Sequence, residues 1–100
     1  MRVIETEEFG QWIKRLKDRM AKFMIAKRLQ RIRDSGHLGD VAPVGQGVSE
    51  LRIHYGPGYR IYLLQHGDVL VVLLHGGDKD SQTTDIKRAI ELAQAWREGQ

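Results

Sequence analysis

The sequence predicts an α+β fold: a short N-terminal strand, two helices, a three-stranded antiparallel meander, and a C-terminal helix packed on one sheet face. Apolar residues recur at helical spacing through the first third of the chain, alternate with a period of two through the middle, and return to helical spacing near the end. One hundred residues is a normal length for one compact domain, so residues 1–100 are expected to form a single domain.

The first third begins as an extended segment and continues as helix. Residues 1–5 are expected to form a strand, and Thr6, followed by Glu7 and Glu8, suits a helix N-cap. Two apolar stripes at helical spacing follow, carried by Phe9, Trp12, Ile13, Leu16 and Met20 and then by Ile25, Leu29 and Ile32. The spacing leaves open whether the chain breaks between the two helices near residues 18–21.

The middle of the chain has the pattern of an antiparallel sheet. Residues 37–43 are interpreted as an irregular connection, and strands are predicted over residues 48–55, 59–66 and 69–75. Short glycine-containing connections separate these strands, so neighbouring strands should be antiparallel. Gly76-Gly77 should stop the last strand.

The final segment is predicted to be a helix. Asp80 or Ser81 could cap it. Its inner apolar face should carry Ile86, Ala89, Ile90 and Ala93.

Alternation along the strands gathers polar side chains on one sheet face. If Tyr55 and Tyr59 lie opposite each other across a three-residue loop, Arg60 faces His54 on one neighbouring strand and His75 on the other. The same face then carries Glu50, Arg52 and Tyr62, with Lys79 just beyond the strand end.

Clustered arginines on one sheet face suggest an anionic ligand. Like charges opposed across strands are unfavourable unless an anion completes the site, and phosphate is the obvious candidate. The alternative is that Arg52 or Arg60 forms a salt bridge with Glu50, Asp78 or Asp80.

Composition narrows the function classes. The absence of cysteine excludes disulfides and thiol catalysis, and the histidine spacing suggests no metal site, so no cofactor is expected. The longest apolar run, residues 69–74, is too short to span a bilayer, and the N-terminus does not resemble a signal peptide. We therefore expect a cytoplasmic protein that does not act in a membrane.

The charge distribution is uneven although the net charge is only +3. Between Lys14 and Arg33 there are nine basic residues and only Asp18 as an acid. This pattern fits a surface for a polyanion such as RNA, and the alternative is a solvated helical face.

Three segments of the sequence together resemble a known family. They are Gly39-Asp40, the run from Val44 to Tyr62 (VGQGVSELRIHYGPGYRIY), and Gly76-Gly77-Asp78-Lys79 with the nearby Gln82. On these segments the chain resembles the HigB-like "addiction module killer protein" branch of the RelE/ParE toxins.

The resemblance implies a RelE-like fold and a toxin of a type II toxin–antitoxin system. It further implies cleavage of mRNA, usually on the ribosome, and neutralisation by a cognate antitoxin, usually a helix-turn-helix DNA-binding protein. Two alternatives remain open at this point. One is a gyrase-inhibiting toxin like ParE, and the other is a non-catalytic RNA-binding module.

Metal-independent RNA cleavage suggests a role for each polar residue of the sheet. Arg60 and Arg52 are expected to bind phosphate oxygens, Lys79 to add charge and donate a proton, and His54 to act as the base. His54 could instead be an ordinary surface residue. The remaining candidates form a substrate-binding set in which an aromatic ring could stack on a base: Tyr62, Glu50, His75 and Gln82.

Overall fold

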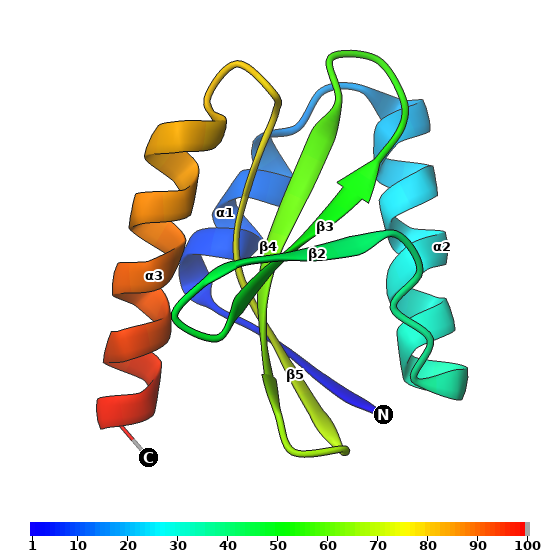
Figure 1. Cartoon of the computed structure of the whole chain (residues 1–100). Helices are drawn as coiled ribbons and strands as arrows, with labels where there is room; N and C mark the ends of the chain where they lie inside the picture. Colours follow the sequence, from blue (N-terminus) through cyan, green and yellow to red (C-terminus); the bar gives the residue numbers. More distant parts are fainter. Residues whose placement is uncertain (100) are drawn as a thin grey trace.

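A five-stranded sheet runs through the middle of the computed structural model, which describes residues 1–99 (Figure 1). The strands are β1 (Arg2–Glu5), β2 (Val41–Gly45), β3 (Val48–Ile53), β4 (Tyr59–His66) and β5 (Leu70–Gly77), and the helices are α1 (Glu7–Arg15), α2 (Arg19–Ser35) and α3 (Gln82–Glu98). The strand order is β1-β5-β4-β3-β2, in which β1 is parallel to β5 and the other pairs are antiparallel. The predicted α+β fold is confirmed.

Each of the two N-terminal helices begins at a residue whose side chain caps it. The Thr6 hydroxyl accepts a hydrogen bond from the Phe9 backbone N–H at 3.1 Å, as expected for the N-cap of α1. The Asp18 carboxylate accepts one from the Ala21 backbone N–H at 3.0 Å. Asp18 therefore begins a second helix, which answers the question that the sequence left open.

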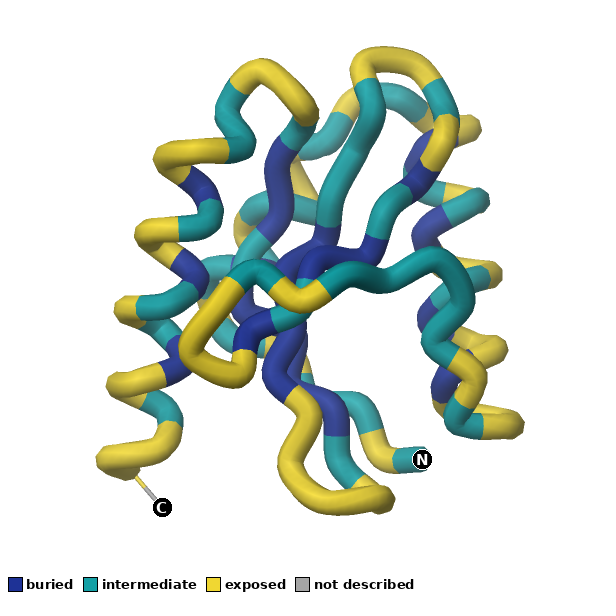
Figure 2. The backbone as a smooth tube through the Cα atoms, viewed as in Figure 1, coloured by how far each residue is buried: buried dark blue, intermediate teal, exposed yellow. Residues whose placement is uncertain are grey.

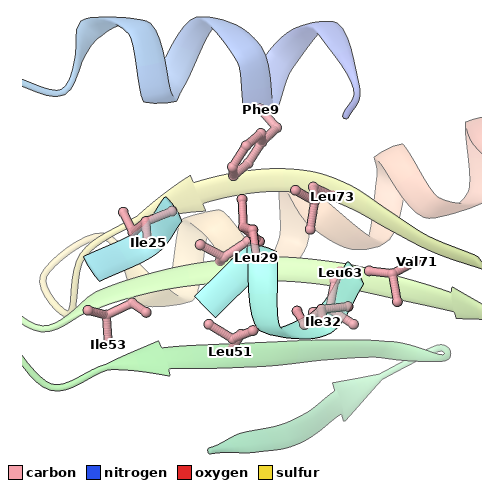
Figure 3. Packing of buried hydrophobic residues seen from close by; sticks show 10 residues of the cluster. Phe9, Ile25, Leu29, Ile32, Leu51, Ile53, Leu63, Val71 and Leu73 are labelled. Atoms are coloured by element: carbon pink, nitrogen blue, oxygen red, sulfur yellow. The ribbon is translucent and has the colours of Figure 1, made fainter. Parts of the chain in front are cut away.

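The sheet has an apolar core on each face. Helices α1 and α2 cover one face, and the core there is formed by Phe9, Ile25, Leu29, Ile32, Leu51, Ile53, Ile61, Leu63, Val71 and Leu73 (Figure 3). Helix α3 covers the other face over Val48, Tyr62, Leu64, Val72, Leu74, Ala89 and Ala93. Figure 2 shows that buried residues are concentrated in the middle of the sheet, while exposed residues lie at the loops and recur along the helices.

The structure differs from the sequence prediction at the two ends of the meander. Residues 41–45, within or next to the segment interpreted as irregular, form the edge strand β2, even though it contains Pro43. An edge strand tolerates proline because its missing N–H can lie on the unpaired side. At the other end, Gly76 and Gly77 continue β5 instead of stopping it.

The register of β3 against β4 is shifted by two residues from the predicted one. Arg52 lies opposite Arg60, Glu50 opposite Tyr62, and Ile53 opposite Tyr59. The reason is the connection, which spans residues 54–58 and is therefore longer than the three residues assumed. Because side chains alternate with a period of two, a two-residue shift leaves every side chain on its predicted face.

The register of β4 against β5 also differs from the prediction. The pairing shifts between Tyr62 and Leu63, where β5 contains one extra residue. A turn of three residues (67–69), in place of the two predicted, adds a second position, so Arg60 lies opposite Gly77 and His75 lies opposite Tyr62. A β-bulge of this kind moves all later residues of one strand by one position.

None of the helices within residues 1–99 is long and apolar enough to cross a membrane.

Candidate functional site

Four cationic or titratable side chains collect at one end of the sheet. Arg52 and Arg60 are direct cross-strand partners on the face covered by α3, His54 directly follows β3, and Lys79 lies between β5 and α3. In Figure 1 the loop between β3 and β4 and the loop between β5 and α3 lie at the same end of the molecule. We call Arg52, His54, Arg60 and Lys79 the basic cluster.

Gly58 marks the point where two members of the basic cluster meet. A Cβ atom placed on Gly58 would lie 2.7 Å from Arg60 Nη1 and 3.6 Å from Lys79 Cβ. The backbone of Gly58 has φ +81°, a conformation that favours glycine. The Gly-Pro-Gly turn thus leaves room for the Arg60 guanidinium beside Lys79.

Arg60 is held by protein groups and is largely buried. Its Nη1 donates to the Gly58 carbonyl at 2.5 Å, and its Nε lies 3.8 Å from Glu50 Oε1. The side chains of Arg60 and Glu50 are 14% and 4% exposed. Gln82 Nε2 donates to the other Glu50 oxygen at 2.7 Å. Arg60 therefore forms an ion pair with Glu50, one of the carboxylates that the sequence offered as its partner.

Arg52 and His54 share one carboxylate, that of Asp40. Arg52 Nη2 donates to Asp40 Oδ1 at 2.7 Å, and His54 Nε2 contacts Asp40 Oδ2. The hydrogen bond from Arg52, together with that from His54, lowers the pKa of Asp40, and the same carboxylate raises the pKa of Arg52. The Asp40 carboxylate and the Arg52 guanidinium therefore remain ionised at neutral pH.

Arg28 fixes the segment that carries Asp40. Its guanidinium donates to the carbonyls of Arg52 at 2.9 Å, Leu38 at 2.9 Å and Asp40 at 3.4 Å. In return the Arg52 backbone N–H donates to the Asp40 carbonyl at 3.0 Å. Asp40 is thus held beside β3, which fixes where its carboxylate meets Arg52 and His54.

Tyr62 does not present its ring to a ligand, contrary to the prediction. It is fully buried in the core beneath α3, and its ring stacks on that of His75 with centroids 6.5 Å apart. Burial raises the pKa of Tyr62, so its hydroxyl stays protonated. The prediction that a base stacks on Tyr62 was wrong because alternation shows which face a residue lies on but not which part of that face α3 covers.

His75 is not the cross-strand partner of Arg60, and it lies near two carboxylates instead. Its Nε2 lies 3.0 Å from Asp85 Oδ1, and its Nδ1 lies 3.7 Å from Glu8 Oε2. A hydrogen bond from Arg88 lowers the pKa of Glu8. The difference from the predicted position has two causes: the β4–β5 turn contains three residues (67–69) instead of two, and the bulge in β5 adds one further position, so that His75 lies opposite Tyr62.

The structure thus divides the eight predicted site residues into three groups. The basic cluster is brought together at one end of the sheet, Glu50 and Gln82 bind each other behind Arg60, and Tyr62 and His75 pack beneath α3. Sequence reasoning missed Asp40 as a contact of the cluster. The β-branched residues Val41 and Val44 that follow it were the available signal for a strand beside β3.

Asp40 makes the stability of this end of the sheet dependent on pH. Its pKa in the folded chain lies below the ordinary 3.8, so its stabilising contribution is complete above that value and is lost as pH falls through the lowered one. We expect Asp40→Asn to lower the melting temperature at neutral pH. That difference should shrink below about pH 4. Thermal denaturation from pH 3 to 7 measures it, and a difference independent of pH would contradict the role.

Within residues 1–99, no group of three or more His, Asp or Glu side chains is placed to hold a metal ion.

Comparison with known proteins identifies a family and a fold. Residues 11–98 match the family described as Phage derived protein Gp49-like (DUF891). An uncharacterized protein of Haemophilus influenzae is 47% identical over 89 residues, which are 89% of each chain.

Two solved structures share the fold. A mutant of the E. coli toxin RelE in the free state has a TM-score of 0.70 and 14% identity, over 90% of this chain and 94% of that one. The intact E. coli RelBE toxin–antitoxin complex has a TM-score of 0.64 and 15% identity, over 77% and 94%. These matches confirm the RelE-like fold that the sequence resemblance implied. With nearly nine-tenths of its length matched to the family, the chain belongs to the Gp49-like phage-derived proteins.

Proposed function

We propose that this chain is the toxin of a type II toxin–antitoxin system and that it cleaves mRNA without a metal ion. The observation that carries the proposal is the cross-strand pair Arg52–Arg60, flanked by His54 and Lys79, on a RelE-like fold. One of the solved structures with this fold is a complex of a toxin with its antitoxin, which supports a cognate antitoxin as the partner.

Cleavage of RNA without a metal requires three groups around one phosphate. A base removes the proton of the 2′-hydroxyl, whose oxygen attacks the adjacent phosphorus, and cations stabilise the negative charge that builds on the phosphate oxygens. An acid then protonates the departing 5′-oxygen as the P–O5′ bond breaks. The products are a 2′,3′-cyclic phosphate and a 5′-hydroxyl.

His54 is the base in this proposal. Its side chain is 76% exposed, so RNA can reach it. In the neutral form of the ring, the nitrogen that contacts the ionised Asp40, Nε2, carries the proton, and Nδ1 keeps a lone pair for the 2′-hydroxyl. Asp40 orients the ring in the way that a carboxylate orients a catalytic histidine.

The arginines supply cationic donors to the phosphate, and Lys79 supplies the proton. Arg60 Nη1 donates a hydrogen bond to the Gly58 carbonyl, and Arg52 Nη2 donates one to the Asp40 carboxylate. Each guanidinium keeps a second terminal nitrogen for a phosphate oxygen. Lys79 is exposed beside Arg60, where its ammonium can protonate the leaving oxygen.

Induced expression followed by primer extension tests the proposal. Wild-type protein should produce discrete mRNA breaks. His54→Ala should reduce their rate by about 10²–10⁴-fold, because it removes the base. His66→Ala changes an exposed histidine at the opposite end of β4 and should leave the breaks unchanged. Lys79→Ala should also slow cleavage, with exposed Lys87→Ala as its control.

Other outcomes would favour other functions. A DNA-damage response without mRNA breaks would indicate a gyrase-directed toxin, and RNA binding without either effect would indicate a non-catalytic module. Cleavage by His54→Ala at the wild-type rate would overturn the assignment of the base. Comparison of ribosome-bound with free mRNA tests ribosome dependence. Rescue of growth by a helix-turn-helix protein encoded beside the toxin tests the antitoxin.

A further inference from the structure

A groove separates the first half of α2 from the end of β3. It has a volume of about 510 Å³, within the range of about 300–1,000 Å³ that is usual for small-molecule sites. Its lining consists of Met20, Phe23, Met24, Lys27, Arg28, Arg31, Ile53 and His54. We call it the α2 groove.

Two apolar residues of the α2 groove, Met20 and Phe23, are exposed and lie outside the apolar core. Met20 and Phe23 are 52% and 58% exposed, whereas α2 packs on the sheet through Ala21, Ile25, Leu29 and Ile32. Packing therefore does not explain a phenylalanine on the outer side of this helix. Exposed apolar residues that lie together commonly mark a ligand site.

The charged lining of the α2 groove is entirely basic. Lys27 and Arg28 are adjacent on one turn of α2, Arg31 lies one turn further on, and the residues that line the groove include no carboxylate. Lys27 Nζ lies 5.4 Å from the centre of the Phe23 ring. An aromatic ring among cations is the combination with which proteins bind single-stranded nucleic acid, because bases stack on the ring while cations follow the phosphates.

His54 connects the α2 groove to the basic cluster. It lines the groove and also contacts Asp40, which binds Arg52. A strand with one phosphate at the basic cluster could therefore place its neighbouring nucleotide in the groove. This continuity favours RNA over an acidic peptide. A peptide would also match the charge of the groove, but only RNA would use the groove and the proposed phosphate site together.

We propose that the α2 groove binds an unpaired nucleotide of single-stranded RNA next to the phosphate held by the basic cluster. The base packs on Phe23 and the neighbouring methionines, and Lys27 and Arg31 contact the backbone phosphates. This inference rests on the proposed function, since it identifies a second contact for the same substrate.

Fluorescence anisotropy with a short single-stranded 2′-O-methyl RNA tests the proposal, because this RNA lacks the attacking hydroxyl and cannot be cleaved. Phe23→Ala should weaken binding by about 5–100-fold through loss of stacking. It should leave the salt dependence unchanged, because no charge is removed. Lys27→Ala should instead reduce the slope of log K against log salt by about 0.7. Val69→Ala, which changes another exposed apolar residue in the turn before β5, should have no effect.

Two results would overturn the proposal. One is equal RNA binding by Phe23→Ala and Val69→Ala, with melting temperatures showing that both are folded. The other is binding of poly-L-glutamate that is as tight as that of RNA and equally dependent on Phe23, which would identify a site for acidic peptide.

The experiments distinguish failure of the proposal for the α2 groove from failure of the proposed nuclease activity. If the RNA binds through Phe23 but induced wild-type protein produces no mRNA breaks, the groove stands and the nuclease proposal fails. If breaks occur and Phe23→Ala binds and cleaves like wild type, the nuclease proposal stands and the groove is overturned.

Discussion

Replacement of Arg60 with alanine should lower the free energy of unfolding by about 3–5 kcal/mol, because it removes the cation from a buried ion pair. The Glu50 carboxylate, 4% exposed, would then have Gln82 as its remaining side-chain donor. Urea denaturation followed by far-UV circular dichroism measures the change. Loss of toxicity in this variant would therefore reflect stability as well as chemistry.

Two further variants separate stability from activity at Arg60. The double variant Glu50→Gln with Arg60→Met should regain most of the lost stability, since neither charge stays buried alone. Arg60→Lys keeps the positive charge but loses the planar guanidinium. This variant should therefore be folded, and it should cleave RNA more slowly than the wild-type protein if the proposed reaction is correct. An Arg60→Ala variant as stable as wild type would mean that the pair with Glu50 contributes nothing to the fold.

Gly76→Ala should also destabilise the protein strongly. An added Cβ would lie only 2.3 Å from Trp12 Cε3, so either the indole ring or β5 would have to move. Such overpacking typically costs about 1–3 kcal/mol, and sometimes more. The midpoint of urea denaturation reports the loss. A smaller side chain at position 12, as in Trp12→Leu, should recover part of it in the double variant.

Gly10→Ala is the matched control for Gly76→Ala, because it adds the same methyl group elsewhere. Gly10 lies inside α1, and an added Cβ there would meet no atom within 4 Å. Alanine should therefore stabilise the helix by about 0.5–1 kcal/mol. If both alanine variants shift the midpoint in the same direction, contact with Trp12 does not explain the glycine at position 76.

Periodicity was sufficient to predict most of the fold. The helices and the meander have strong apolar patterns, and Thr6 was correctly predicted as an N-cap. Strand β2 was missed because Pro43 and the glycine at position 45 reduce its strand propensity. The registers were wrong because the five-residue β3–β4 loop, the three-residue β4–β5 turn and the one-residue bulge leave no clear trace in the sequence.

The sequence was sufficient to predict which sheet face carries the arginines of the candidate site, but not which side chains they contact. Alternation placed Arg52 and Arg60 on one face, and this survived a two-residue error in register. The carboxylate of Asp40 comes from another segment, so its contact with Arg52 depends on a strand pairing that was not predicted. Burial of Tyr62 likewise depends on where α3 crosses the sheet.

The two outer strands of the sheet also determine how this molecule can meet others. β1 has only four residues, and β2 contains Pro43 and an irregular pairing beside it. Neither edge offers a long, regular row of free N–H and C=O groups on which another chain could add a strand. Both features disfavour edge-to-edge aggregation, and we therefore expect a binding partner to recognise side chains instead of extending the sheet.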